Sequence, residues 1–491
     1  MLKIYNSLTN KKEVFRPRKS KRVNMFVCGI TPYDSPHIGN FRAAIVYDLL
    51  ARYLRFAGYD IFYLQNITDI DDKIIRAAKE KNKGWKEIGD YYFKEYLAIG
   101  KKLNITSVTK YAKATAHIKE IIAQIETLIK KGYAYEKNGS VYFEVSKFKN
   151  YGKLSRQNLK KLYTGARLEK DPDKKHPYDF VLCKVRESLG RETSKYEPAW
   201  KSPWGLGRPG WHIEDTAISE HYFGPQYDIH GGAVELKFPH HEAEVAQQES
   251  ASGRTPFVKY WAHCGILFIN GEKMSKSLGN FIAGKEMVEK YDPDYFRFMI
   301  VSAHYRSPID YSEKLIHQAK TNLENIRNFA RELKKIKQKT GAPFDAAAFK
   351  KQFLQAMDDD FNTPRALAVT FKMMRRANAL LARPVRKKSL QATKVAPDGA
   401  AFSNGGRGKL SAVSAKEIIS FFKNAEGIFG VSFTKTKTVG IPAHIRELAK
   451  EREKLRKEKK WAEADALRGQ IKKNGYEIKD LESGYEITLI V

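Results

Sequence analysis

The fold is decided by residues 22–40, which read RVNMFVCGITPYDSPHIGN. The segment 22–28 is short and apolar, as expected of a buried strand, and the Gly- and Pro-rich stretch 29–40 predicts a turn. Apolar side chains at helical spacing over 41–57 predict a helix, and the run 59–65 predicts a second strand. Strand, turn, helix and strand begin a βαβ unit. We therefore expect an α/β protein with a doubly wound parallel sheet.

A different pattern separates the two halves of this sheet domain, which we expect at 1–125 and 206–307. Residues 126–205 contain short strands, many Lys and Gly residues, and a Pro- and Trp-rich stretch at 197–204. This composition predicts a connective insertion between the two halves.

The C-terminal part is predicted to be helical, followed by a small α+β module. Apolar residues at helical spacing indicate a helical domain over 308–440. Within it, 386–412 is rich in Lys, Gly, Ser and Ala, which is typical of a flexible linker. A highly charged helix and a closing hairpin make up 441–491.

The chain is long and strongly basic. Its 491 residues exceed what one core accommodates, so several domains are expected. Lys and Arg number 88 against 56 Asp and Glu, a formal net charge of +32. Such an excess favours a polyanionic partner such as nucleic acid, because each neutralised phosphate releases counterions. A generally basic proteome is the alternative.

Cysteine usage and hydropathy indicate a cytoplasmic protein. The three cysteines, Cys28, Cys183 and Cys264, are far apart in sequence, so no disulfide framework is expected. No stretch approaches a membrane span, and the N-terminus lacks the apolar region of a signal peptide. We expect no membrane partner.

Two motifs predict a single ATP site. In the first turn, Gly39 lets the backbone approach a phosphate at a helix N-terminus, and His37 can donate to a phosphate oxygen. A capping turn without a ligand would explain this motif if it stood alone. Lys273-Met274-Ser275-Lys276-Ser277 adds two lysines on a Ser/Gly loop, which can stabilise charge on departing pyrophosphate.

These motifs resemble the HIGH and KMSKS signatures of class I aminoacyl-tRNA synthetases. Further segments are similar to the cysteinyl-tRNA synthetase family in particular, namely 26–34, 65–73, 207–214, 228–232, 238–242 and 357–364. The resemblance covers nearly the whole chain except 386–412. It implies a Rossmann-type catalytic domain, a helical tRNA-binding domain and a C-terminal anticodon-binding module.

The resemblance implies a monomeric ligase that converts L-cysteine, with ATP and Mg²⁺, to cysteinyl-adenylate. The enzyme would then transfer the cysteinyl group to tRNA(Cys). His37, Lys273 and Lys276 would be catalytic. The positions implied to hold ATP are Gly39, Asn40, Gly231, Gly232 and Lys276. Those implied to line the amino acid pocket are Thr68, Trp211 and His230. Asn40 replaces a histidine of the family, and Ala233 and Glu235 replace a glycine and an aspartate, so weaker ATP binding is expected.

The resemblance also implies one Zn²⁺ per chain that holds the substrate thiol, with ligands Cys28, Asp215, His240 and Glu244. His240 and Glu244 lie four apart on an expected helix and could share a metal on that ground alone, although such pairs are more often surface contacts. The family carries cysteine where this chain has Asp215. Aspartate keeps the charge but is a harder donor, so cysteine specificity depends on this position while adenylation does not.

Two alternatives remain open from the sequence. A cysteine ligase of the mycothiol type would share the turn at 28–34 and the metal chemistry, but is expected to lack the C-terminal module. A non-catalytic RNA-binding paralogue would have lost its metal, and Asp215 and Asn40 leave room for it.

Overall fold

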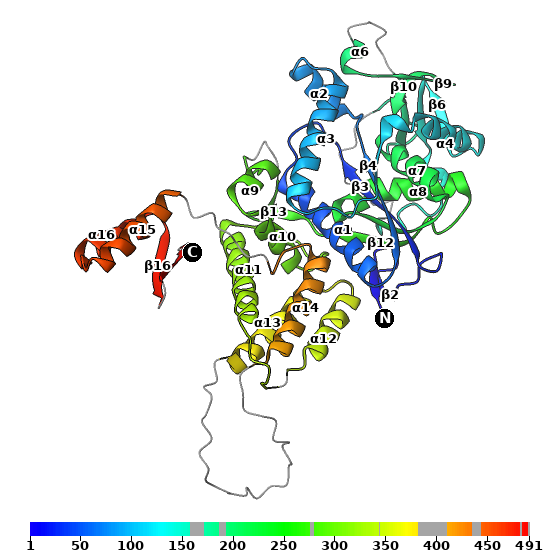
Figure 1. Cartoon of the computed structure of the whole chain (residues 1–491). Coiled ribbons are helices and arrows are strands. Elements are labelled where there is room, and N and C mark those ends of the chain that lie inside the picture. Colours follow the sequence, from blue (N-terminus) through cyan, green and yellow to red (C-terminus); the bar gives the residue numbers. More distant parts are fainter. Residues whose placement is uncertain are drawn as a thin grey trace, which may run out of the picture. The chain divides into compact units, whose positions relative to one another are not determined.

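The computed structural model (Figure 1) describes residues 1–157, 171–185, 193–274, 279–342, 344–381, 410–434, 443–481 and 484–489. The chain forms two compact units, Met1–Thr434 and Lys435–Val491. Lys276, and the expected linker up to residue 409, lie outside the described residues.

A five-stranded parallel sheet forms the centre of the N-terminal unit. Its order is β12-β11-β3-β4-β5, and every neighbouring pair is parallel. The strands are β3 (Arg22–Ile30), β4 (Asp60–Ile67), β5 (Lys110–Lys113), β11 (Tyr227–Ala233) and β12 (Val258–Cys264). The predicted doubly wound α/β fold is therefore confirmed.

The helix after the first strand begins three residues earlier than expected. Helix α1 spans Ile38–Phe56, where periodicity predicted a start at 41. The earlier start was not predicted because the residue that caps the helix is His37, and histidine is not among the usual capping residues. The turn before it is correspondingly shorter, and β3 extends to Ile30.

Helices cover both faces of the parallel sheet. Along β3, Met25 and Val27 belong to the core that includes α1, whereas Phe26 belongs to the core on the opposite face. This alternation is the two-residue period of a strand. Helices α7 (Trp211–Phe223) and α8 (His240–Ser252) supply Ile218 and Val245 to that second core.

A second, antiparallel sheet lies in the chain between β5 and β11. Its order is β6-β7-β8-β10-β9. The strands are β6 (Ala134–Lys137), β7 (Ser140–Phe143), β8 (Phe180–Val185), β9 (Trp200–Ser202) and β10 (Gly205–Pro209); α4 (Ile118–Lys130) precedes them and α6 (Thr193–Tyr196) joins β8 to β9. By its strands, the inserted sheet runs from Ala134 to Pro209.

The rest of the N-terminal unit is mainly helical. Helices α2 (Asp72–Glu80) and α3 (Trp85–Lys102) follow β4, and the hairpin β1 (Lys3–Asn6) and β2 (Lys11–Val14) begins the chain. A small sheet contains β13 (Leu267–Ile269), β14 (Glu272–Lys273) and β15 (Ile309–Tyr311). The later helices are α9 (Gly284–Lys290), α10 (Pro293–Ser302), α11 (Glu313–Lys334), α12 (Ala346–Asp358), α13 (Thr363–Leu381) and α14 (Ala412–Phe429).

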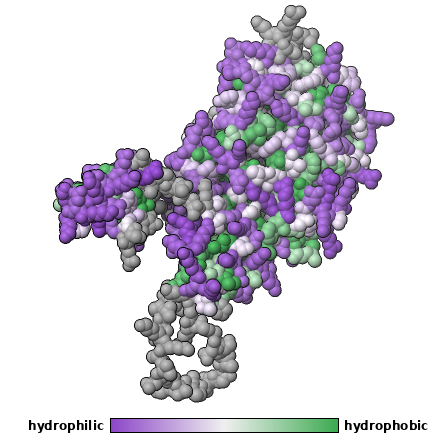
Figure 2. Space-filling model, in the orientation of Figure 1, coloured by the Kyte–Doolittle hydropathy of each residue, from purple (hydrophilic) through white to green (hydrophobic). Residues whose placement is uncertain are grey.

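The C-terminal unit contains two helices and a hairpin. Helices α15 (Ala443–Lys457) and α16 (Trp461–Lys473) precede β16 (Tyr476–Leu481) and β17 (Gly484–Leu489). Arg452 of α15 makes a two-pronged ion pair with Asp480 of β16. The face of α15 and α16 seen in Figure 2 is almost entirely hydrophilic. Among the described residues of both units, no helix has the length and apolarity to cross a bilayer.

A buried ion pair joins α1 to α10. Arg297 and Asp48 are both fully buried, and Arg297 also donates to the carbonyl oxygens of Phe429 and Leu103. Burial alone would raise the pKa of Asp48, but Arg297 and Arg52 outweigh it and hold this pKa below its ordinary value. The pair therefore stabilises the fold at neutral pH and loses that contribution as the pH falls through the lowered pKa.

We expect Arg297→Met to destabilise the N-terminal unit by about 3–5 kcal/mol, because it removes the nearest cation from a buried carboxylate. Urea denaturation at pH 7 measures this loss. The control is Lys335→Met, whose ion pair with Glu332 is exposed and should contribute less than about 0.5 kcal/mol. A loss below about 1 kcal/mol for Arg297→Met would show that the pair is not a structural anchor.

Candidate active site

The first turn of α1 is closed by its own side chains. His37 Nδ1 accepts a hydrogen bond from the Gly39 amide at 3.1 Å, and the His37 amide donates to Asn40 Oδ1 at 3.0 Å. A Cβ atom at Gly39 would lie 2.9 Å from the His37 ring and from Met274, so only glycine fits here. The structure thus gives Asn40 a capping role, through its oxygen, that the sequence did not suggest.

His37 is a neutral hydrogen-bond donor. Burial lowers its pKa from 6.5 to about 4, with Glu235 opposing and Lys273 adding to this shift. Because Nδ1 accepts from Gly39, the single ring proton of the neutral form is on Nε2. An N–H group at a helix N-terminus is suited to a phosphate oxygen.

The lowered pKa also predicts a stability signature. The folded state favours neutral His37. Its contribution to the free energy of unfolding is therefore complete above pH 6.5 and is lost as the pH falls from 6.5 to about 4. The change in free energy of unfolding caused by His37→Gln should therefore differ between pH 7 and pH 4, with wild type losing more stability on acidification. Urea denaturation of both proteins across this range measures the difference. Parallel pH profiles would contradict a neutral, buried His37.

A cavity of about 510 Å³ lies at the carboxyl edge of the parallel sheet. In the sheet, β3 lies between β4, which follows it in the chain, and β11, which comes only after β5 and the inserted sheet, so the strand order reverses at β3. Ligands of open α/β sheets bind at such a switch point. The sequence-predicted residues that line the cavity are Cys28, His37, Gly39, Asn40, Gly232 and Lys273. The two predicted motifs, more than 230 residues apart in sequence, therefore contribute to one cavity.

Lys273 pairs with Glu235 across the cavity, with 2.7 Å between Nζ and Oε2. Both side chains are partly exposed, so this is a weak pair that a charged ligand can replace. Lys276, the second predicted lysine, lies outside the described residues.

The two predicted glycines of β11 differ in position. Gly232 lines the cavity, and a Cβ there would lie 2.6 Å from the His241 ring. Gly231 packs on Tyr47, whose ring would be 2.3 Å from an added Cβ. The Tyr47 hydroxyl accepts from the Gly232 amide, so Gly231 allows the close packing that orients Gly232.

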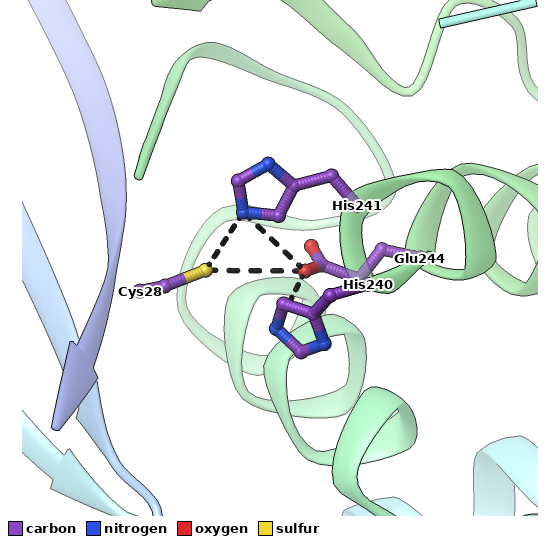
Figure 3. A group of neighbouring side chains, drawn as sticks. All are labelled: Cys28, His240, His241 and Glu244. Atoms are coloured by element: carbon purple, nitrogen blue, oxygen red, sulfur yellow. Dashed lines mark hydrogen bonds and ion pairs between the residues drawn. The ribbon is translucent and has the colours of Figure 1, made fainter. Parts of the chain in front are cut away.

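Behind Cys28 lies a cluster of possible metal ligands (Figure 3). Cys28, near the end of β3, faces His240, His241 and Glu244 from the first turns of α8, and one ligand atom from each lies within 4.8 Å of the others. Glu244 Oε1 is 3.1 Å from His240 Nε2 and 3.9 Å from Cys28 Sγ. Cys28 Sγ is 3.1 Å from His241 Nε2.

Asp215, on α7, contributes a further donor to this cluster. Its Oδ2 lies 3.2 Å from Cys28 Sγ and 3.1 Å from His240 Nε2. All four ligand positions implied by the resemblance are thus close together in space. His241 is an additional donor that the sequence did not predict.

The cluster has the charge and chemistry of a divalent-cation site. Burial, followed by the charges of Asp215 and Glu244, raises the pKa of the Cys28 thiol well above its ordinary value. Burial, Asp215 and Glu214 likewise raise the pKa of Glu244. Glu244 Oε2 is buried and makes no hydrogen bond, although His230 Nε2 lies 3.5 Å from it. One sulfur, imidazole nitrogens and carboxylate oxygens are the ligand types of zinc, so the residues fit that ion.

Other histidines hold the rings of the cluster in place. His240 Nδ1 is 2.7 Å from His212 Nδ1, and His241 Nδ1 is 2.8 Å from His263 Nε2. His263 in turn contacts the Ser7 hydroxyl at 2.8 Å. Each ring therefore directs its Nε2 toward the cluster, the orientation that a second hydrogen bond usually gives a metal-binding histidine.

Of the three residues predicted to line the amino acid pocket, Trp211 and His230 contact cluster residues, and Thr68 contacts Glu214, the sequence neighbour of Asp215. Thr68 donates to the buried carboxylate of Glu214. Trp211, 42% exposed, stacks on His240 with 4.1 Å between ring centroids. His230 Nε2 is 3.4 Å from Cys28 Sγ. Thr68, Trp211 and His230 are not among the described residues that line the cavity, and Cys28 is the one cluster residue that is. The role of these three residues in an amino acid pocket therefore stays a prediction.

Family comparisons match three parts of the chain. The family described as "tRNA synthetases class I (C) catalytic domain" matches residues 14–321. A DALR domain matches 352–396, and a "Cysteinyl-tRNA ligase anticodon binding domain" matches 438–485.

Similar proteins of known name match nearly the full length. A cysteine–tRNA ligase of Carboxydothermus hydrogenoformans is 41% identical and covers 98% of this chain and 99% of its own. One from Thermococcus onnurineus is 40% identical and covers 98% of both. Among solved structures, Mycobacterium tuberculosis methionyl-tRNA synthetase with methionyl-adenylate shares the fold, with a TM-score of 0.57, 14% identity and coverage of 83% of this chain and 89% of its own.

Proposed function

The chain belongs to the cysteinyl-tRNA synthetase family of class I, and we propose that it activates L-cysteine with ATP and transfers the cysteinyl group to tRNA(Cys). The observation that carries the proposal is the shared cavity. It joins the helix N-terminus at His37 and Gly39, the lysine of the second motif, and the Cys28 end of the metal-ligand cluster. A phosphate-binding turn and a sulfur-binding site therefore meet where a carboxylate could attack an α-phosphate.

In the first step, the N-terminus of α1 receives the triphosphate of ATP, which carries Mg²⁺. Neutral His37 donates a hydrogen bond from Nε2–H to a phosphate oxygen. Lys273 leaves Glu235 and pairs with the negative charge of the phosphates. The cysteine carboxylate attacks the α-phosphate and pyrophosphate leaves. In the second step, a terminal hydroxyl of the tRNA attacks the carbonyl carbon of the adenylate and AMP leaves.

Selection of cysteine is assigned to the metal-ligand cluster. Cys28, Asp215, His240 and Glu244 would hold one Zn²⁺, which when bound would hold the substrate sulfur as a thiolate and favour it over the serine hydroxyl. Trp211 and His212 keep His240 in place, and His230 stands beside Cys28. We expect Gly39, Asn40, Gly231, Gly232 and Lys276 to support ATP binding.

The C-terminal unit favours a tRNA partner over an amino-sugar acceptor. The match at 438–485 is to an anticodon-binding domain, and a ligase of the mycothiol type is expected to lack such a module. We further propose a monomeric enzyme that acts in the cytoplasm.

Aminoacylation with radioactive cysteine tests the proposal. We expect charging of a tRNA(Cys) transcript and no product with a 2-amino sugar. Ligation to the sugar without charging of tRNA would support the mycothiol-type alternative. Binding of tRNA without charging would support the non-catalytic paralogue.

A further inference from the structure

Asn66 connects the metal-ligand cluster to the turn that follows β3. Its side chain is buried on β4, at 2% exposure. Oδ1 accepts a hydrogen bond from the Gly29 amide at 2.6 Å, and Nδ2 donates to Asp215 Oδ1. A Cβ at Gly29 would fall 1.7 Å from the Asn66 carbonyl oxygen, so β3 and β4 meet too closely for any other residue. Asn66 thus fixes both the neighbour of Cys28 and one oxygen of Asp215.

The two carboxylate oxygens of Asp215 have different partners. Oδ1 is bonded to the Asn66 amide, while Oδ2 lies 3.2 Å from Cys28 Sγ and 3.1 Å from His240 Nε2. A free carboxylate can bind a metal through one or both oxygens. Here only Oδ2 remains for the cluster.

We propose that Asn66 is a positioning residue that makes Asp215 a one-oxygen metal ligand. The inference rests on the metal site of the proposed function. It explains how an aspartate can stand where the family carries a cysteine: one oxygen with one negative charge occupies the place of one thiolate sulfur.

The consequence concerns the place left for the substrate. Four protein ligands already match the number that zinc usually takes, so a further protein oxygen would compete directly with a substrate sulfur for a place on the ion. A carboxylate that binds through both oxygens would occupy that place. By holding Oδ1, Asn66 would prevent this competition and leave room for the sulfur of cysteine.

A double-mutant cycle tests this role through metal affinity, without using activity. Zinc affinity is measured by competition with a chromophoric chelator for wild type, Asn66→Ala, Asp215→Cys and the double variant. We expect Asn66→Ala to weaken zinc binding about 10–100-fold when residue 215 is aspartate, the usual effect of losing a partner of a metal ligand. With cysteine at 215 we expect only the smaller loss that follows from the missing Gly29 contact, at least about threefold less than with aspartate, because a thiolate has no second atom for the amide to hold.

Asn66→Ala also removes the hydrogen bond to the Gly29 amide. This loss is the same whether residue 215 is aspartate or cysteine, so it cancels when the two changes in zinc affinity are compared. Equal losses in the two backgrounds, or no loss with Asp215, would overturn the proposal. Melting curves of the metal-free proteins check folding, and Asn66→Ser, a smaller change, replaces Asn66→Ala if that variant does not fold. If wild type binds no zinc, the metal site itself fails, which is a different result from a failure of Asn66 alone.

Discussion

Replacing Cys28 with serine is expected to remove bound zinc and to reduce cysteine-dependent pyrophosphate exchange more than about 100-fold. Loss of a residue that only supports a metal ligand costs 10–100-fold, and loss of the ligand itself should cost more. Cys28 lines the cavity and lies within 3.1–3.4 Å of Asp215, His230 and His241, so a weaker donor here affects every partner. Metal analysis and exchange kinetics of the purified variant measure both losses.

Cys183→Ser is the matched control for this prediction. Cys183 is a free cysteine like Cys28, but it is buried on β8 of the inserted sheet, where it packs in a separate core. We expect it to keep zinc and exchange activity. A Cys28→Ser protein that retains both zinc and exchange would remove Cys28 from the site.

Replacing His37 with glutamine is expected to lower the kcat of pyrophosphate exchange about 10²–10³-fold, the usual cost of removing one preorganised donor to developing charge. Zinc content should not change, because His37 is in the ATP-side turn rather than the metal-ligand cluster. This separation of rate from metal content distinguishes His37 from Cys28. Stopped assays at saturating ATP and cysteine measure the rate.

An exposed histidine on α11, His317, provides the comparison for His37. His317→Gln should leave exchange unchanged, whereas the melting temperature checks that His37→Gln is folded. An effect below about threefold for His37→Gln would mean that the helix N-terminus and Lys273 suffice without the imidazole.

Sequence periodicity predicted the parallel sheet but not the buried polar helices around the metal-ligand cluster. In α8 every residue from His240 to Ala251 is buried, although HHEAEVAQQESA reads as a solvent-exposed helix. In α7 a continuous run from Ile213 to Ser219 is buried. Helices covered on all sides carry no amphipathic pattern, so periodicity gave no reason to place Asp215 there. Its position came from the resemblance alone.

The ligand cluster could be predicted only in part for a similar reason. The four-residue spacing of His240 and Glu244 indicated a shared face, as the structure shows. His241 was missed because neighbouring residues on a helix usually face different ways, whereas both rings stand at the first turn of α8 beside Cys28. Asn66 and Glu214 were missed because their partners are far apart in sequence. The signals available in the sequence for His241 and Glu214 were the doublets of possible metal ligands, His240-His241 and Glu214-Asp215.

Cysteine-dependent pyrophosphate exchange, measured with each of the twenty amino acids, tests the central claim most directly. The shared cavity of His37, Lys273 and Cys28 predicts exchange with cysteine, in protein that carries about one zinc per chain. His240→Ala should lose the zinc together with the exchange, and serine should support far less exchange than cysteine. No exchange with any amino acid would contradict the assignment of this cavity to adenylate formation.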